Sequence, residues 1–435
     1  MSFDNLPCGW KLVTLEDAMD AIIDYRGKTP KKTESGIPLI TAKIVKGGYV
    51  LEPFEFIAED NYDSWMVRGL PQVGDVVLTT EAPLGETAQL TSSNVALAQR
   101  IVTLRGKKGL LDNDFLLCAL QSDFVQHQLE SRASGSTVKG IKQSELRKVS
   151  LPIPPLHQQK KISQVLKSLS NKLVCNTQTN QTLEQMAQAI FKSWFVDFDP
   201  VKAKMNGEQP EGMDAATASL FPEKLVESEL GLIPEGWEVS ALSELIKLTG
   251  GGTPKRSEET YWNGDIPWFS VKDVPSGSNV FVVDTDEKIT ELGLSKSSTK
   301  LLPKGTTIIT ARGTVGKLAL VGTDMCMNQS CYGIRGKEVG DYYNYFNLKQ
   351  AVSTLQQNTH GAVFDTITTK TFDTYSLAFG GVELANKFDA LIAPLLQKIE
   401  ANVRQNIELS ALRDTLLPKL LSGEIELAEI SKTIK

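Results

Sequence analysis

The sequence predicts an α+β protein in which two mixed α/β modules are separated by two long antiparallel coiled-coil helices. Two observations predict this fold class. A pattern that begins at residues 7–10 (Pro-Cys-Gly-Trp) begins again at residues 234–237 (Pro-Glu-Gly-Trp), and each copy is followed by a long heptad repeat. The chain therefore has a pseudo-two-fold internal repeat, which suits a target with two sites or a pair of partners.

Composition bounds the class of protein. The chain has 435 residues, 41% hydrophobic and 23% charged, which is typical of a globular protein with about two to four domains. The five cysteines show no paired spacing, so we expect reduced thiols in a cytoplasmic protein. We expect no secretory signal, and no apolar stretch approaches the roughly 18 residues of a membrane span.

The net charge of -6 counts mildly against a free-standing nucleic-acid binder. It does not exclude one, because binding depends on local patches and a partner subunit can supply phosphate contacts.

The first module is expected at residues 1–155 and the second at residues 227–381. Short β-rich runs alternate with Gly, Pro and Asn turns in both copies, and a helix is expected from about Asp114 to Ser131. The matched positions include Thr29-Pro30 with Thr253-Pro254, the run 74–79 with 305–310, and Gln99 with Gln329.

Each module is followed by a helix with a heptad seam, expected at residues 156–198 and 382–425. The first seam consists of Ile162, Leu166, Leu169, Leu173, Asn176, Asn180, Leu183, Ala187, Ile190 and Trp194. The second consists of Phe388, Ile392, Leu395, Ile399, Asn402, Asn406, Leu409, Arg413, Leu416 and Leu420. Both asparagines recur in register, and only Arg413 breaks the second apolar seam.

Chain order predicts that the two helices run antiparallel if they pack on each other. Setting Ile162 opposite Leu420 then sets Asn176 opposite Asn406 and Asn180 opposite Asn402. A buried layer of asparagines fixes register at a cost in stability. The alternative, two unrelated amphipathic helices, leaves the matched asparagines unexplained. Each helix would rise roughly 60 Å and act as a spacer.

Two further segments lie outside the modules and helices. Residues 199–226 carry Pro, Gly and scattered charges, which predicts an irregular linker, and residues 426–435 form a C-terminal tail.

Catalytic and cofactor motifs are not recognisable in the sequence. No glycine-rich fingerprint follows a strand, and residues 313–318 lack two elements of a phosphate loop. The three histidines are far apart and match no metal-ligand spacing, so no metal site is expected. The sequence thus argues against catalysis by this chain alone.

Four places that recur in both modules could contact a ligand. The first is a cationic loop, Arg26, Lys28, Lys31 and Lys32 in module one, and Lys255 and Arg256 followed by Tyr261, Trp262 and Trp268 in module two. Cations beside aromatic residues suit a phosphate backbone with base or sugar contacts. For any single lysine, a solvated turn is the alternative.

The second and third places pair hydroxyl groups with charges. Thr41 and Lys43 match Ser270 and Lys272, and the run Thr79-Thr80-Glu81 matches Thr310-Ala311-Arg312. Because Arg favours guanine and Glu favours the cytosine amino group, modules that read bases here should read different ones.

The fourth place is the segment 134–142, whose counterpart is 360–367; a plain helix-to-strand turn is the alternative. Together the four places give these DNA-binding candidates: Arg26, Lys28, Lys31, Lys32, Thr41, Lys43, Thr79, Thr80, Glu81, Ser136, Thr137, Lys139, Lys142, Lys255, Arg256, Tyr261, Trp262, Ser270, Lys272, Thr310, Arg312, Thr314, Lys317 and Thr366.

Several stretches resemble a known family. Residues 151–159, 191–200, 209–213, 233–237 and 420–425, with the openings of the second module at 252–268 and 310–317, are similar to the specificity subunit of a type I restriction–modification system. Module one departs from that pattern because its Thr29-Pro30 loop lacks the tryptophans of module two.

The resemblance implies a non-catalytic subunit with two target recognition domains. Each would read one half of a bipartite double-stranded DNA site, and the paired helices would set the gap and dock two modification (methyltransferase) subunits that methylate adenine. Restriction (translocase/nuclease) subunits would join them. S-adenosylmethionine, ATP and Mg are expected on those partners, none is expected on this chain, and no membrane association is expected.

Two other functions remain open from the residues. One is a coiled-coil protein-interaction adaptor with two modules and no role on DNA, which would lack the steep salt dependence of phosphate contacts. The other is a self-contained nuclease or methyltransferase, against which the missing cofactor loop counts.

Overall fold

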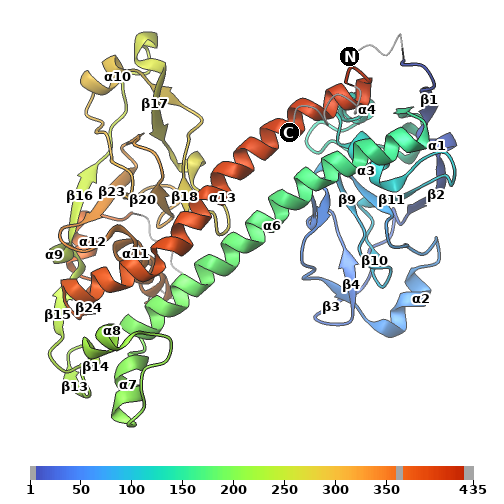
Figure 1. Cartoon of the computed structure of the whole chain (residues 1–435). Helices are drawn as coiled ribbons and strands as arrows, with labels where there is room; N and C mark the ends of the chain where they lie inside the picture. Colours follow the sequence, from blue (N-terminus) through green and yellow to red (C-terminus); the bar gives the residue numbers. More distant parts are fainter. Residues whose placement is uncertain (1–5, 359–365, 426–435) are drawn as a thin grey trace. The chain divides into compact units, whose positions relative to one another are not determined.

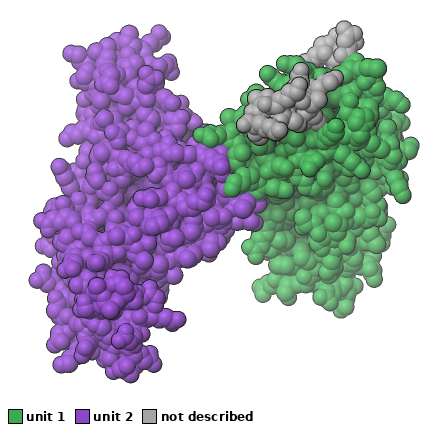
Figure 2. All heavy atoms as spheres, in the orientation of Figure 1, with its two compact units in different colours: residues 1–173, 408–435 green, residues 174–407 purple. Residues whose placement is uncertain are grey.

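The computed structural model describes residues 6–358 and 366–425, and it divides into two compact units (Figures 1 and 2). Unit 1 comprises residues 1–173 and 408–435, and unit 2 comprises residues 174–407. Each unit contains one α/β module and a part of each long helix. The C-terminal tail at residues 426–435 lies outside the described residues.

The module of unit 1 contains two four-stranded sheets. The first has the order β2-β11-β8-β9 with antiparallel neighbours, and the second has the order β10-β4-β7-β3, in which β10 runs parallel to β4. The strands are β1 (Lys11–Thr14), β2 (Met19–Asp24), β3 (Lys32–Thr33), β4 (Ile37–Ile40), β5 (Val45–Lys46), β6 (Tyr49–Val50), β7 (Phe56–Ile57), β8 (Val76–Thr80), β9 (Leu84–Gln89), β10 (Ala96–Leu97), β11 (Ile101–Gly106) and β12 (Ser150–Ile153). The short helices are α1 (Leu15–Ala18), η1 (Glu59–Asn61), α2 (Tyr62–Trp65) and α5 (Gln143–Leu146).

The single helix predicted from about Asp114 to Ser131 is wrong. Two helices, α3 (Asn113–Leu120) and α4 (Asp123–Arg132), replace it. Ser122 separates them, because its hydroxyl donates to Ala119 O at 2.6 Å and accepts from Val125 N at 3.4 Å as the N-cap of α4. Apolar periodicity on both sides of the break concealed this cap.

The module of unit 2 has a corresponding pair of sheets, one with five strands and one with three. Its main sheet has the order β16-β23-β20-β21-β18, and a second sheet has the order β19-β17-β22 with β17 parallel to β22. The strands are β13 (Leu225–Ser228), β14 (Gly231–Pro234), β15 (Glu238–Ala241), β16 (Ile246–Gly250), β17 (Trp262–Phe269), β18 (Phe281–Val282), β19 (Lys288–Ile289), β20 (Thr307–Thr310), β21 (Leu318–Val321), β22 (Cys326–Met327), β23 (Cys331–Gly336) and β24 (Ser376–Phe379). The short helices are α9 (Leu242–Leu245), η2 (Glu259–Tyr261), η3 (Val271–Asp273), α10 (Glu291–Ser295) and α12 (Thr369–Asp373), and α11 (Asp341–Asn358) is longer.

Strand register confirms the internal repeat. Ile101 of β11 pairs with Thr79 of β8, as Cys331 of β23 pairs with Thr310 of β20. The parallel pairs also correspond, because β10 lies beside β4 as β22 lies beside β17.

The predicted irregular linker is instead folded. It contains α7 (Asp199–Met205) and α8 (Ala215–Ser219), and Val201 and Phe221 are buried in the core of unit 2. The ring of Phe221 lies edge-on to that of Trp194, with centroids 5.4 Å apart. Proline and glycine content marked the turns of this segment but not its buried apolar residues.

The two long helices are α6 (Leu156–Phe195, 40 residues) and α13 (Val382–Ser422, 41 residues), coloured green and red in Figure 1. In unit 1, Ile162 and Leu166 share a core with Leu420, which confirms the predicted antiparallel pairing. Every predicted seam position, including Arg413, is buried or half-buried. No helix within the described residues is long and apolar enough to cross a membrane.

In unit 2, the asparagines meet as predicted. Asn176 Nδ2 donates to Asn406 Oδ1 at 2.8 Å, and Asn402 Nδ2 donates to Asn180 Oδ1 at 2.9 Å. Asn176 also donates to Gln405 Oε1 at 2.9 Å. Because both pairs form, the register of the helices is the one expected from the recurring asparagines.

Candidate nucleic-acid interface

The loop of module two that follows β16 begins with two glycines, Gly251 and Gly252. A Cβ at Gly251 would lie 1.9 Å from Asn328 O, and one at Gly252 would lie 2.4 Å from Ser298 Oγ. Only glycine permits such close approach. The two glycines therefore allow the start of the loop to pack closely against neighbouring backbone. This packing places Thr253 and Pro254 beside the residues that follow β22.

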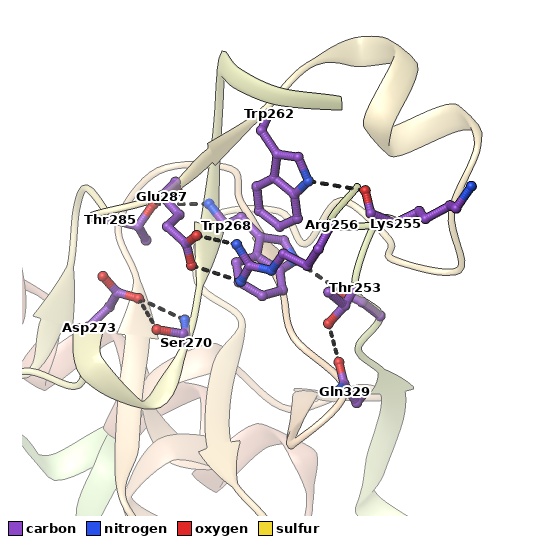
Figure 3. Close-up of polar contacts among 11 residues, drawn as sticks. Thr253, Lys255, Arg256, Trp262, Trp268, Ser270, Asp273, Thr285, Glu287 and Gln329 are labelled. Atoms are coloured by element: carbon purple, nitrogen blue, oxygen red, sulfur yellow. Dashed lines mark hydrogen bonds and ion pairs between the residues drawn. The ribbon is translucent and has the colours of Figure 1, made fainter. Parts of the chain in front are cut away.

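Arg256 is held in place by aromatic rings and a carboxylate (Figure 3). Its guanidinium lies 4.0 Å from the ring centroid of Trp262 and 5.0 Å from that of Trp268, and its Nη2 donates to Glu287 Oε2 at 3.0 Å. The hydrogen bond from Arg256 lowers the pKa of Glu287. The predicted grouping of a cation with aromatic side chains is thus present. Its contacts, however, favour a structural role for Arg256 within the loop over contact with DNA.

The two tryptophans fasten the same loop. Trp262 Nε1 donates to Lys255 O at 3.3 Å, and Trp268 Nε1 donates to Gly252 O at 3.0 Å. Trp268 is only 2% exposed, and Tyr261 is half-buried with its carbonyl accepting from Thr290 N at 3.0 Å. Lys255 forms an ion pair with Glu258 at 3.1 Å, but its side chain is 69% exposed, so its ammonium group remains accessible to a phosphate.

The corresponding loop of module one uses other contacts. Arg26 Nη1 donates to Ile141 O at 2.7 Å, and Lys32 and Lys43 both lie near Glu55, at 2.8 and 3.7 Å. These interactions favour a structural role for Arg26 and partly neutralise the two lysines. Lys28 and Lys31 are exposed, and within the described part of the chain neither has an ion-pair partner.

At the second candidate place, the hydroxyl groups are buried or bonded within the protein and the lysines are exposed. Ser270 is the N-cap of η3, and its hydroxyl donates to Asp273 Oδ2 at 2.9 Å. Thr41 is 8% exposed. These two hydroxyl groups favour a structural role, whereas Lys43 and Lys272 are exposed.

The third and fourth places come together in each module. Glu81 forms a bridge with Gly140 in module one, and Arg312 forms the equivalent bridge with Thr366 in module two. The adjoining backbone bonds match as well, since Ile141 N donates to Thr80 O and Ile367 N donates to Ala311 O, both at 3.0 Å. We call these paired segments the tip of each module: residues 79–81 with 134–142 in module one, and residues 310–312 with 366–367 in module two. Residues 360–365 of the fourth place lie outside the described residues.

Threonines support each tip from inside the sheet. Thr79, Thr80 and Thr310 are 0%, 2% and 0% exposed. Thr79 Oγ1 accepts from Glu86 N at 2.9 Å, and Thr310 Oγ1 donates to the carbonyl oxygen of Thr314. Their burial favours support of the tip over direct contact with DNA.

The charges at the two tips differ. Glu81 forms an ion pair with Arg100 at 2.9 Å, and both side chains are about half exposed. Thr80 N donates to Arg100 O at 2.9 Å as Ala311 N donates to Ser330 O at 2.8 Å, so Arg100 corresponds to Ser330. Sequence reasoning missed Arg100, although its position directly after Gln99 could have revealed it.

The remaining candidates are exposed. They are Ser136, Thr137, Lys139 and Lys142 of module one and Arg312, Thr314, Lys317 and Thr366 of module two. Among the described residues, none of the four basic side chains in this set forms an ion pair within 4.0 Å.

A further polar contact recurs in both modules. Thr253 Oγ1 donates to Gln329 Oε1 (Figure 3), and Thr29 Oγ1 donates to Gln99 Oε1 at 3.3 Å. The glutamines belonged to the matched sequence skeleton but not to the predicted site.

Comparison with known proteins places these features in a family. A model described as the type I restriction modification DNA specificity domain matches residues 7–185 and 234–402. The type I restriction enzyme HindI specificity subunit of Haemophilus influenzae is 29% identical over 76% of this chain and 82% of its own. The MjaIX specificity subunit of Methanocaldococcus jannaschii is 25% identical over 98% of this chain and 96% of its own.

The fold has a counterpart among solved structures. The S subunit of a type I restriction–modification system from M. genitalium has a TM-score of 0.59 and 16% identity, with 96% of both chains covered. The matches to the family model occupy both modules and both helix regions. The chain therefore belongs to the type I restriction–modification DNA specificity family.

Proposed function

We propose that this chain is the non-catalytic DNA-specificity subunit of a type I restriction–modification complex, and that each module reads one half of a bipartite site. The observation that carries the proposal is the pair of tips. They have the same backbone bridges but present Glu81 with Arg100 in one module and Arg312 in the other. Two modules that share a backbone structure but present different polar groups suit the recognition of two different half-sites.

The α6–α13 pair sets the unread gap between the half-sites and docks the modification subunits. The buried asparagine pairs support this role, because they fix one helix register and hence one repeat distance. Adenine methylation with S-adenosylmethionine, and cleavage with ATP and Mg, belong to the partner subunits.

Exposed cations supply contacts to the DNA backbone. Lys28, Lys31, Lys139 and Lys142 in module one, and Lys272 and Lys317 in module two, are exposed. Each phosphate neutralised makes binding fall further with salt. The net charge of -6 is compatible with this because the cations occupy the loops.

Replacement of residues 227–381 by another recognition domain of the family tests the proposal. The methylated motif of a host carrying the partner subunits is read by long-read sequencing, with the native gene and its deletion as controls. One half-site should change while the other half-site is retained. If both half-sites change, the modules do not read independently; if the native gene produces no motif that deletion removes, the DNA role is wrong and the protein-interaction adaptor replaces it.

A further inference from the structure

The Thr–Gln contact occupies the same place in both modules. Gln99 follows β10 and Gln329 follows β22, the strands that run parallel to β4 and β17. Each glutamine accepts from a threonine that precedes a buried proline, Pro30 or Pro254. The prolines anchor the loop, and the threonine and glutamine join its outer edge to the neighbouring strand end.

Each threonine also begins the sequence Thr-Pro-Lys. Lys31 lies two residues after Thr29, and Lys255 lies two residues after Thr253. Both lysines are exposed. In both modules, therefore, the loop whose threonine holds the glutamine amide also carries an exposed ammonium group.

Stability does not explain why this arrangement is repeated. Thr29 and Gln329 are exposed and their partners are half-buried, so each hydrogen bond competes with water and contributes little to folding. Nearby residues have diverged, with Arg100 replaced by Ser330 and Glu81 by Arg312. A surface feature kept while its neighbours change is expected to contact something that both half-sites share.

The chemistry of the glutamine indicates what that shared feature is. When Oε1 accepts from threonine, the two N–H groups on Nε2 stay available as donors. Within the described residues, neither Gln99 nor Gln329 uses Nε2 in a hydrogen bond to the protein. Amide and ammonium donors together suit the phosphate oxygens, which are present in every DNA sequence.

We infer that Thr29, Lys31 and Gln99 in module one, and Thr253, Lys255 and Gln329 in module two, are matched phosphate-contacting sites. They position each module on the DNA backbone and do not read bases. This inference rests on the proposed function. It assigns sequence-independent anchoring to the Thr-Pro-Lys loops and leaves discrimination between bases to the tips.

The test measures binding and methylation by the complex assembled with its partner subunits. Gln329→Leu removes the amide donors and should weaken binding about tenfold to specific and non-specific DNA alike, with the methylated motif unchanged. Gln99→Leu should do the same through module one. Lys255→Ala should also reduce the slope of log K against log salt by about one, whereas the exposed Lys300→Ala should leave the slope as it is.

Conservative variants separate contact from folding. Thr253→Ser keeps the hydroxyl and should bind as the native complex does, whereas Thr253→Val frees the glutamine and should weaken binding. Circular dichroism of each variant checks the fold, and Gln329→Glu, which keeps the side-chain size, replaces Gln329→Leu if the latter unfolds.

Three results would overturn the inference. A changed base in one half-site with Gln329→Leu would make the glutamine a base reader. Unchanged affinity for DNA in the Gln329 and Gln99 variants would mean that the Thr–Gln hydrogen bonds only hold the loops in place. Weaker DNA binding in the variants of one module only would show that the two sites are not matched. Absence of specific binding by the native complex would instead refute the proposed function.

Discussion

Asn402 Nδ2 donates to Asn180 Oδ1 at 2.9 Å, and the two side chains are 1% and 0% exposed. Asn180 in turn donates to Asn279 Oδ1 of module two at 3.1 Å. A polar chain thus runs from α13 through α6 to a loop of the module in unit 2. A shifted register would leave these buried amides without partners, so the contact selects one helix pairing.

Replacing Asn402 by Leu should destabilise unit 2. The change leaves Asn180 Oδ1 buried without its donor, which costs about 1–3 kcal/mol. The double variant Asn180→Leu/Asn402→Leu should recover part of this loss because it removes both members of the pair. Chemical denaturation of the two variants measures the difference, and equal stability of Asn402→Leu and the native chain would contradict a buried polar layer.

The helix pairing could be predicted from sequence because it depends on spacing within two segments. The Asn positions recur at fixed heptad places, so their opposition follows from chain direction alone. The contacts of Arg256 could not be predicted in the same way. Glu287 is distant in sequence, and only the folded β17 and β19 region brings its carboxylate to the guanidinium.

For the tips, too, some features could be predicted from sequence and others could not. Matching Glu81 to Arg312 was possible from sequence, because both follow a strand of the same pattern. The Glu81–Arg100 ion pair depends on β8 and β11 being neighbours in the sheet, which no local pattern specifies. Burial of Thr79 and Thr310 depends on the same pairing.

Asp389 of α13 caps α11 from outside that helix. Its Oδ1 accepts from Tyr342 N at 2.8 Å and from Tyr343 N at 2.9 Å. Burial raises the pKa of Asp389, and the two backbone donors oppose that shift. A raised carboxyl pKa means that its charged form is penalised in the folded state, so this group reduces stability as pH rises through the unfolded and then the folded pKa.

Asp389→Ala and Asp389→Asn should therefore differ. Alanine removes the acceptor for both N–H groups and should cost about 1 kcal/mol at pH 7, the typical value of a lost cap. Asparagine keeps an acceptor and avoids burying a charge, so it should be close to the native chain. Urea denaturation gives both values, and equal losses in the two variants would show that the charge itself holds α11.

The ion pair between Arg256 and Glu287 predicts a specific pH response. The hydrogen bond from Arg256 lowers the pKa of Glu287 below its ordinary value of 4.5. The contribution of a depressed carboxyl pKa is present above the unfolded pKa and is lost as pH falls through the folded pKa. The loop should thus be unaffected between about pH 6 and 8 and loosen only in acid.

Arg256→Gln should return the pKa of Glu287 toward 4.5. NMR titration of the Glu287 carboxyl in the native chain and in Arg256→Gln measures the shift directly. Lys255→Gln is the matched control, because it removes a neighbouring cation that pairs with Glu258. Equal titration curves for the native chain and Arg256→Gln would contradict the ion pair.

Arg312 should determine one base of the half-site read by module two. Its side chain is exposed at the tip, and a good bidentate contact to guanine discriminates by about 1–3 kcal/mol. Arg312→Ala should relax one position in that half-site and leave the other half-site unchanged. The methylated motif, read by long-read sequencing, provides the measurement. A uniform loss of affinity with the motif intact would make Arg312 a phosphate contact.

A heptad inserted in both helices tests whether α6 and α13 set the gap. Insertions between residues 177 and 178 and between residues 404 and 405 keep Asn176 opposite Asn406 and Asn180 opposite Asn402. Seven residues add roughly 10 Å of helix, so the unread gap should lengthen by about three base pairs at 3.4 Å each. An insertion in α6 alone cannot satisfy both asparagine pairs, so it should abolish specific methylation. If the double insertion methylated a motif with the original gap, the helix pair would not set the spacing, and the asparagine layer would serve only to choose the register of the helices.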